Sequence, residues 1–146
     1  MQKLLGPKIL IVESRFYHKI SDMLLEGAIN EIKKNNCEYE VITVPGAFEV
    51  PATISFASKT NKYDGYVALG CVIRGETTHY DYVCSESARG LNDLAIKNNL
   101  AIGYGIITVE NETQAIARAD IKQKNKGGFA SMTCLKMIEI KKKFER

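Results

Sequence analysis

The chain has 146 residues, of which 45% are apolar and 25% charged, as expected for one globular domain with a substantial core. The net charge is only +3 and no basic stripe with interleaved aromatic residues occurs, so a nucleic-acid partner is not expected. Four cysteines without ligand spacing and only two histidines argue against a metal site and indicate reduced thiols in a cytoplasmic protein. No signal peptide is recognisable and no apolar run could span a bilayer, so no membrane partner is expected.

Strand-like and helix-like segments alternate along the whole chain. Short runs rich in β-branched residues predict strands, and apolar residues at helical spacing predict helices. The strands are expected at 8–13, 39–44, 63–73 and 101–109, and the helices at 19–35, 50–58, after Thr78, after Asn111 and from about 127 to 144. The helix stripes expected to face inward are Ile20, Leu24, Ala28 and Ile32, then Tyr80, Cys84, Ala88, Leu91 and Ala95, and finally Ala130, Cys134, Met137 and Ile138.

This alternation predicts one α/β domain over residues 1–146. Strands that alternate with helices form a parallel sheet covered on both faces, here a four-stranded sheet in a three-layer α/β/α sandwich. In such sheets ligands bind outside the carboxyl ends of the strands. Unusual residues follow all four predicted strands, in the segments 14–18, 45–49, 75–79 and 108–110. The sequence therefore predicts a site at this edge of the sheet.

The turn from Gly75 to Thr78 leads from a strand directly into a helix. Backbone N–H groups and threonine hydroxyls at such a junction can bind a phosphate, with the side chain of Glu76 pointing away. An ordinary helix start capped by a threonine is the alternative. His79 follows in the first helical turn and could transfer protons near neutral pH, or could be a structural histidine.

Other candidates lie in the neighbouring segments. Phe16 and Tyr104 could stack on a planar ring, although an aromatic residue in an apolar strand, such as Tyr104, is usually part of the core. Glu49 could accept hydrogen bonds from the hydroxyls of a polyol, or could be an acid favoured by a helix dipole. Arg118 and Lys126 could bind phosphate if folding or a neighbouring subunit brings them to the turn; alone, each would be a solvated charge.

Five motifs occur in a fixed order over nearly the whole chain: 14–16 (Ser-Arg-Phe), 45–51 (Pro-Gly-Ala-Phe-Glu-Val-Pro), 71–83, 108–111 with 114–115, and 125–127 (Asn-Lys-Gly). Together they closely resemble the 6,7-dimethyl-8-ribityllumazine synthase family. The resemblance implies a flavodoxin-like fold and a transferase of riboflavin biosynthesis. It implies that 5-amino-6-(D-ribitylamino)uracil condenses with 3,4-dihydroxy-2-butanone 4-phosphate, with release of phosphate and water and without a metal or organic cofactor.

The resemblance also implies a role for each matching residue. Phe16 would stack on the uracil ring, and His79 would transfer protons. The ribityl chain would be held by Ala47, Phe48 and Glu49, the pyrimidine by Cys71, Val72 and Ile73, and the phosphate by Glu76 and Thr77 in the turn together with Arg118 and Lys126. Tyr104 stands where the family usually has phenylalanine, and Tyr17 where it usually has asparagine.

The family assembles as pentamers, sometimes as an icosahedral 60-mer, with each active site shared between adjacent subunits. The resemblance therefore implies a homo-oligomer in which a neighbour brings Tyr104 and Arg118 to the turn. The segment Met1–Pro7 would be an arm that adds to a neighbour's sheet edge. No insertion lengthens the segment 118–126, which favours a shell, whereas Asp120 and Lys124 stand where shell-forming members often have glycine, which favours a pentamer. The choice between pentamer and 60-mer therefore stays open.

Three other functions remain as alternatives. A non-catalytic flavin- or lumazine-binding relative would keep the Phe16 pocket and lose the phosphate residues, whereas this chain retains Thr77, His79 and Arg118. A flavodoxin-like electron carrier would need a phosphate-binding loop after the first strand, which the segment 14–17 does not supply. A scaffolding shell would assemble without turnover.

Overall fold

The structure, a computed structural model, describes residues 6–145. Its four strands, β1 (Lys8–Ser14), β2 (Glu38–Val44), β3 (Gly65–Ile73) and β4 (Ile102–Val109), form one sheet in the order β2-β1-β3-β4. All neighbouring strands pair in parallel, which confirms the predicted four-stranded parallel sheet. The predicted N-terminal arm lies largely outside the described residues.

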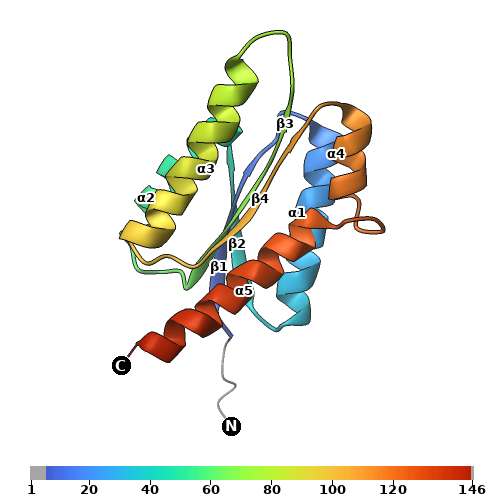
Figure 1. The fold of residues 1–146 in the computed structure, drawn as a ribbon. Helices are drawn as coiled ribbons and strands as arrows, with labels where there is room; N and C mark the ends of the chain where they lie inside the picture. Colours follow the sequence, from blue (N-terminus) through green and yellow to red (C-terminus); the bar gives the residue numbers. More distant parts are fainter. Residues whose placement is uncertain (1–5, 146) are drawn as a thin grey trace.

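Helices cover both faces of the sheet and complete the predicted three-layer sandwich (Figure 1). One face carries α1 (His18–Lys34), α4 (Glu112–Ala119) and α5 (Lys126–Phe144). The other carries the short 3₁₀ helix η1 (Ala47–Glu49), α2 (Val50–Ser58) and α3 (His79–Lys97). Because successive side chains of a strand alternate between faces, β1 contributes Ile9 and Ile11 to one core and Leu10 and Val12 to the other.

The inward face of α1 is the predicted one, since Ile20, Leu24, Ala28 and Ile32 are all buried. The stripe predicted for α3 is wrong in part: Leu91 is buried as predicted, but Tyr80, Cys84 and Ala95 are only half-buried. The buried residues of α3 are Val83, Ser87 and Leu91, whereas Ala88 is exposed. Apolar residues occur on two adjacent faces of this helix, and the spacing alone does not tell which face packs on the sheet. In α5, likewise, Met137 is 41% exposed while Cys134 and Ile138 are buried.

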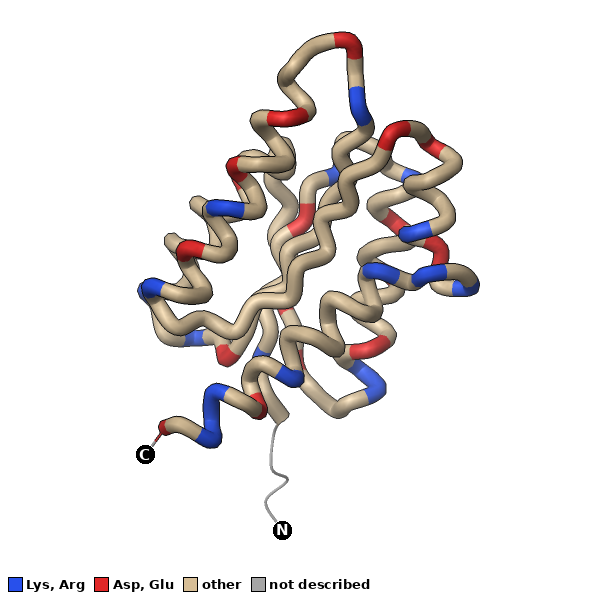
Figure 2. The backbone as a smooth tube through the Cα atoms, in the orientation of Figure 1, with Lys and Arg blue, Asp and Glu red and all other residues tan. Residues whose placement is uncertain are grey.

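Charged residues of both signs are interspersed over the helices and loops rather than gathered on one side (Figure 2). Within residues 6–145, no helix combines the length and the apolar character needed to cross a membrane. The sheet places all four strand ends that precede the candidate site at one edge, the upper edge in Figure 1.

Candidate active site

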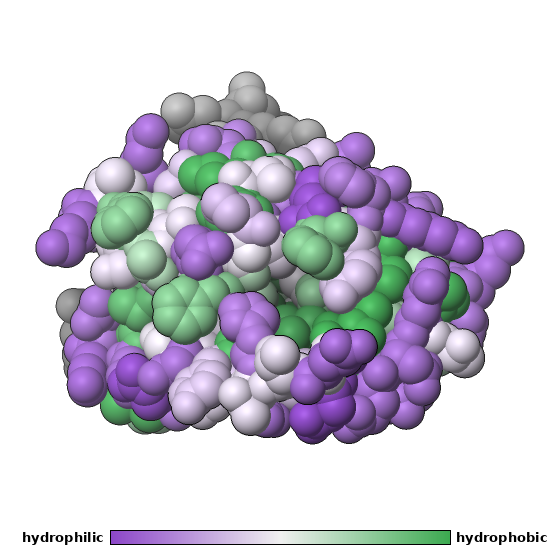
Figure 3. Space-filling model, turned by 90° about the horizontal axis from the view of Figure 1, so that it is seen from above, coloured by the Kyte–Doolittle hydropathy of each residue, from purple (hydrophilic) through white to green (hydrophobic). Residues whose placement is uncertain are grey.

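A cleft opens where the strand order reverses, between the carboxyl ends of β1 and β3. The chain leaves β1 for β2 on one side, and returns to β3 on the other, which leaves a crevice at the strand ends. The cleft, called the first cleft below, has a volume of about 460 Å³ and is lined by Ser14, Phe16, Tyr17, Gly46, Ala47, Phe48, Glu49, Cys71, Val72, Ile73, His79 and Val83. Seen from above, this edge shows apolar side chains surrounded by hydrophilic ones (Figure 3).

The structure brings eight of the predicted site residues together in the first cleft: Phe16, Ala47, Phe48, Glu49, Cys71, Val72, Ile73 and His79. Four lining residues were not predicted. Ser14 ends β1 and Gly46 follows β2, so their position at strand ends was a usable signal. Val83 lies one helical turn after His79 and could have been inferred from that spacing. The sequence marks Tyr17 only as a residue that differs from the asparagine usual in the family.

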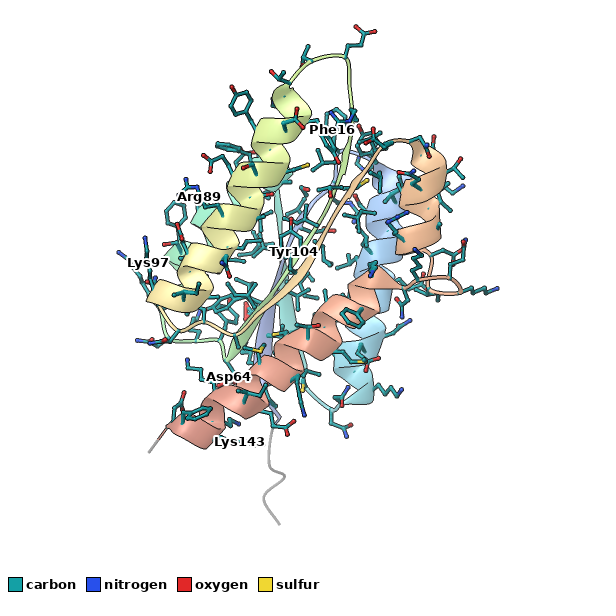
Figure 4. The ribbon with its side chains drawn as sticks, in the orientation of Figure 1. Phe16, Asp64, Arg89, Lys97, Tyr104 and Lys143 are labelled. Atoms are coloured by element: carbon teal, nitrogen blue, oxygen red, sulfur yellow. The ribbon has the colours of Figure 1, made fainter. Side chains whose placement is uncertain are left out.

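The loop after β1 presents Phe16 to the cleft. Its ring is 75% exposed, and its edge meets Tyr17 with 4.9 Å between ring centroids. The loop is anchored from below, because the buried Glu13 carboxylate accepts hydrogen bonds from Arg15 Nη1 (3.1 Å) and Thr43 Oγ1 (2.7 Å). Phe16 therefore sits at the upper edge on a fixed loop with its ring available to a ligand (Figure 4).

The segment after β2 forms a second wall. Ala47 is buried and Phe48 is 54% exposed, so the backbone is packed while the larger side chain faces outward. A side chain at Gly46 would come within 3.2 Å of Glu49 Oε1, so glycine leaves this carboxylate room. No described residue donates a hydrogen bond to the Glu49 side chain; Thr53 bonds only its backbone carbonyl (2.9 Å). The carboxylate oxygens are thus free to accept from hydroxyls of a ligand.

The end of β3 supplies the floor. Burial raises the pKa of Cys71 to about 12, so its thiol stays protonated near neutral pH. A neutral, buried thiol is a poor nucleophile and contributes shape and apolar surface instead. Val72 and Ile73 follow, half-buried, as the strand approaches the surface.

The turn after β3 is open to solvent. In the part of the chain that the structure describes, the backbone N–H groups of residues 75–78 have no acceptor, and Thr78 makes no side-chain cap bond to α3. Thr77 Oγ1 accepts from the N–H of His79 (3.2 Å), a partial form of the threonine cap expected as the alternative. His79 begins α3 and lines the first cleft, whereas Glu76 and Thr77, in the turn that precedes it, do not line this cleft. The turn therefore offers unpaired amide groups next to an imidazole.

Tyr104, Arg118 and Lys126 lie elsewhere. They line a separate cleft of about 230 Å³ on the free edge of β4, called the β4-edge cleft below. Tyr104 is 43% exposed on β4 between α3 and α5 (Figure 4), so the alternative that it is part of the core is wrong. Within one chain, these three predicted residues are not part of the first cleft.

Helix α4 holds Arg118 through its own backbone. Arg118 Nη1 donates to the carbonyl oxygen of Gln114 (3.1 Å). Asn111 caps the helix that the sequence predicts after it, because its side chain accepts from the N–H of Gln114 (2.9 Å). The side chain of Gln114 reaches back to the N–H of Glu110 (2.8 Å) rather than to the cap residue itself.

The start of α5 fixes Lys126 by close packing. Asn125 adopts a left-handed conformation (φ 46°), and its side chain caps the helix by accepting from the N–H of Gly128 (3.2 Å). A Cβ atom at Gly127 would lie 2.0 Å from the carbonyl oxygen of Leu24, so only glycine lets α5 approach α1 this closely. Lys126 Nζ lies 5.4 Å from the centroid of the Phe129 ring.

Charge is divided between the two clefts. Among residues 6–145, no lysine or arginine lines the first cleft, whose one carboxylate is that of Glu49. Both cations of the predicted site line the β4-edge cleft. The described residues contain no group of three or more histidine, cysteine or acidic side chains that could hold a metal ion.

The amino-acid sequence of the chain is similar to those of known proteins. Residues 6–142 match the family model described as 6,7-dimethyl-8-ribityllumazine synthase. Proteins of that name from Bartonella henselae and Bartonella bacilliformis are each 58% identical to the chain, over 93% of it and 89% of the former, and over 98% of it and 96% of the latter. The protein of that name from Zymomonas mobilis is 57% identical over 93% of the chain and 97% of its own length.

Proposed function

The chain belongs to the 6,7-dimethyl-8-ribityllumazine synthase family, and from that premise we propose the reaction that the first cleft performs. It condenses 5-amino-6-(D-ribitylamino)uracil with 3,4-dihydroxy-2-butanone 4-phosphate to 6,7-dimethyl-8-ribityllumazine, a step of riboflavin biosynthesis. The observation that carries this proposal is the first cleft itself, where eight residues matched to the family's site converge from three separate strand ends.

The walls of the cleft suit the pyrimidine substrate. The exposed ring of Phe16 can stack on the uracil. Cys71, Val72 and Ile73 line the pocket for the ring, and the free carboxylate of Glu49 accepts hydrogen bonds from the ribityl hydroxyls beside Ala47 and Phe48. The cleft volume of about 460 Å³ suits a ligand of this size.

The reaction needs proton transfer and a stabilised leaving phosphate. The amine of the uracil attacks the ketone to form an imine with loss of one water, phosphate leaves by elimination, and the ring closes with loss of a second water. His79, at the mouth of the cleft, can move protons between these intermediates. The unpaired amides of the turn, with Glu76 and Thr77, bind the phosphate. Holding two reactants together supplies much of the acceleration.

A phosphorylated substrate in the first cleft needs cations that this cleft does not contain. Arg118 and Lys126 can supply them if the β4-edge cleft of one chain faces the first cleft of another. The proposed enzyme is therefore a homo-oligomer, a pentamer or an icosahedral 60-mer, in which Tyr104 of one subunit also covers the ring bound in the next. Exposed apolar side chains beside β4 support such a contact: Tyr104, Phe129, Met132 and Met137.

The location proposed for the enzyme is the cytoplasm. Cys37, Cys71, Cys84 and Cys134 are all free thiols, which is the state expected in a reducing compartment.

The direct test mixes the purified protein with both substrates and follows lumazine absorbance and fluorescence together with phosphate release. Equal amounts of lumazine and phosphate are expected. A non-catalytic lumazine-binding relative would bind the product and release no phosphate, which would refute the proposed reaction. Light scattering on the same sample distinguishes a single chain, a pentamer and a 60-mer, and a single active chain would refute the shared site.

A further inference from the structure

Arg74 contacts two other segments at once, the start of α3 and the loop after β4. It follows β3 and directly precedes the Gly75–Thr78 turn. Its Nε lies 2.8 Å from Glu110 Oε2, in the loop after β4, and its Nη1 lies 3.6 Å from Asp81 Oδ1, in the first turn of α3. The guanidinium carbon also lies 4.3 Å from the centroid of the Tyr80 ring.

Stability does not account for this arrangement. The Arg74 side chain is 42% exposed and its two carboxylate partners 57% and 58% exposed, so water screens both ion pairs. Exposed pairs of this kind contribute little to the free energy of unfolding. The value of the contacts is therefore geometric: they fix where β3 ends, where α3 begins and where the loop after β4 lies.

The turn between these points has little support of its own. Nothing lies within 4 Å of where a Cβ atom at Gly75 would be, and the side chains of residues 74–79 are exposed. Arg74 holds one end of the turn through the bond from its N–H to the carbonyl oxygen of Val109 (2.9 Å). Its ion pair with Asp81 holds the other end. The spacing of the free amide groups in the turn thus depends on this residue.

We propose that Arg74 is a positioning residue for the condensation: by pairing with Glu110 and Asp81, it keeps the Gly75–Thr78 turn in the shape that binds the phosphate of the butanone substrate. This inference rests on the proposed function. A displacement of about 1 Å in such a binding group is enough to change the rate markedly.

Two variants separate positioning from a simple effect of charge. Arg74→Ala removes the two ion pairs of Arg74, called the Arg74 clamp below, together with one positive charge. Positioning and a simple charge effect therefore both predict weaker phosphate binding. The double variant Glu110→Gln, Asp81→Asn keeps Arg74 and removes two negative charges. A pure charge effect, or direct contact between Arg74 and the phosphate, would then strengthen phosphate binding, whereas loss of positioning would weaken it.

Arg89 provides the matched control. It lies on the outer face of α3 (Figure 4), is 66% exposed and also pairs with two carboxylates, those of Glu86 (2.7 Å) and Asp93 (3.3 Å). Arg89→Ala removes the same charge and the same number of ion pairs, here within α3, away from both clefts. Its kinetic constants should equal those of the wild type.

The experiment measures KM for each substrate and the inhibition constant of inorganic phosphate. For Arg74→Ala and for the double variant, KM for the phosphorylated ketone and the inhibition constant should each rise about tenfold, with KM for the uracil within about twofold. Equal rises for both substrates, no rise, or tighter phosphate binding in the double variant would overturn the proposal. Circular dichroism shows whether each variant is folded. If Arg74→Ala is unfolded, the kinetic constants of the milder double variant test the proposal. A wild type without turnover would instead refute the proposed function.

Discussion

Two variants that each have little activity alone should recover activity when they assemble together. The first, Phe16→Ala with His79→Ala, damages the first cleft and keeps the β4-edge cleft intact. The second, Arg118→Ala with Lys126→Ala, keeps the first cleft and removes the cations of the β4-edge cleft. A complete site forms only where the first cleft of the second variant meets the β4 edge of the first variant.

The size of the recovery follows from the geometry of a closed ring. Each site in such a ring takes one first cleft and one β4 edge from two different copies, so in a random equal mixture about one half times one half, or about a quarter, of the sites are complete. Activity per chain should reach about a quarter of the wild-type value. At a three-to-one ratio it should fall to about three sixteenths, in either direction.

The assay unfolds the two variants together, refolds them and measures lumazine formation over a series of mixing ratios. Light scattering on each sample establishes that mixed and separate preparations assemble alike. Activity should follow the product of the two fractions, with its maximum at the equal mixture. A straight line between the activities of the separate variants would mean that each chain completes its own site, and the shared site would be wrong.

Three further predictions concern single residues. His79→Ala should lower kcat about tenfold in steady-state assays, below the usual general acid–base range, and a loss typical of a catalytic nucleophile would contradict it. Gly127→Ala should lower the free energy of unfolding by about 2 kcal/mol or more, and Tm by roughly 6 °C, because the added Cβ atom would clash with the Leu24 carbonyl. Gly75→Ala is the control: its Cβ atom would contact no other atom, so this variant should unfold like the wild type. Burial raises the pKa of Cys71 from 9.0 to about 12, so between these pH values the folded protein keeps a proton that the unfolded chain releases. Stability to urea should therefore fall as the pH rises from 9.0 to about 12. Cys71→Ala should flatten this decline, and an unchanged slope would contradict the buried neutral thiol.

Much of the fold could be predicted because the alternation of strands and helices is strong. β1 and β3 are buried on both faces and are almost continuously apolar. The bounds of all four strands lie within two residues of the prediction. The packed face of α3 could not be predicted. Ser87 is fully buried although it is polar, since its hydroxyl bonds the Cys84 carbonyl (3.3 Å), and a search for apolar spacing passes over it.

The site was predictable to the extent that it depends on local sequence. Parallel strands bring their carboxyl ends to one edge whatever their order, so Phe16, Glu49 and His79 could be expected together. The position of Arg118 and Lys126 depends on β4 lying at the edge of the sheet, next to β3, and strand order is not written in the spacing of residues. The Arg74 clamp depends equally on this order, because Glu110 follows β4 and Arg74 follows β3.

The distribution of charge ties the proposed chemistry to assembly. A phosphate monoester carries nearly two negative charges near neutral pH, and in one chain the first cleft would meet it with partial charges from the turn and with the carboxylate of Glu49. The cations lie on the β4 edge, where the apolar side chains of Phe129 and Met132 also need to be covered. In the proposed oligomer, one contact between copies would therefore do two things: it would bury this apolar surface and bring Arg118 and Lys126 to the phosphate. On this reasoning a dissociated chain would keep the pocket for the pyrimidine but would bind the phosphorylated substrate weakly, so the proposed reaction would require the oligomer.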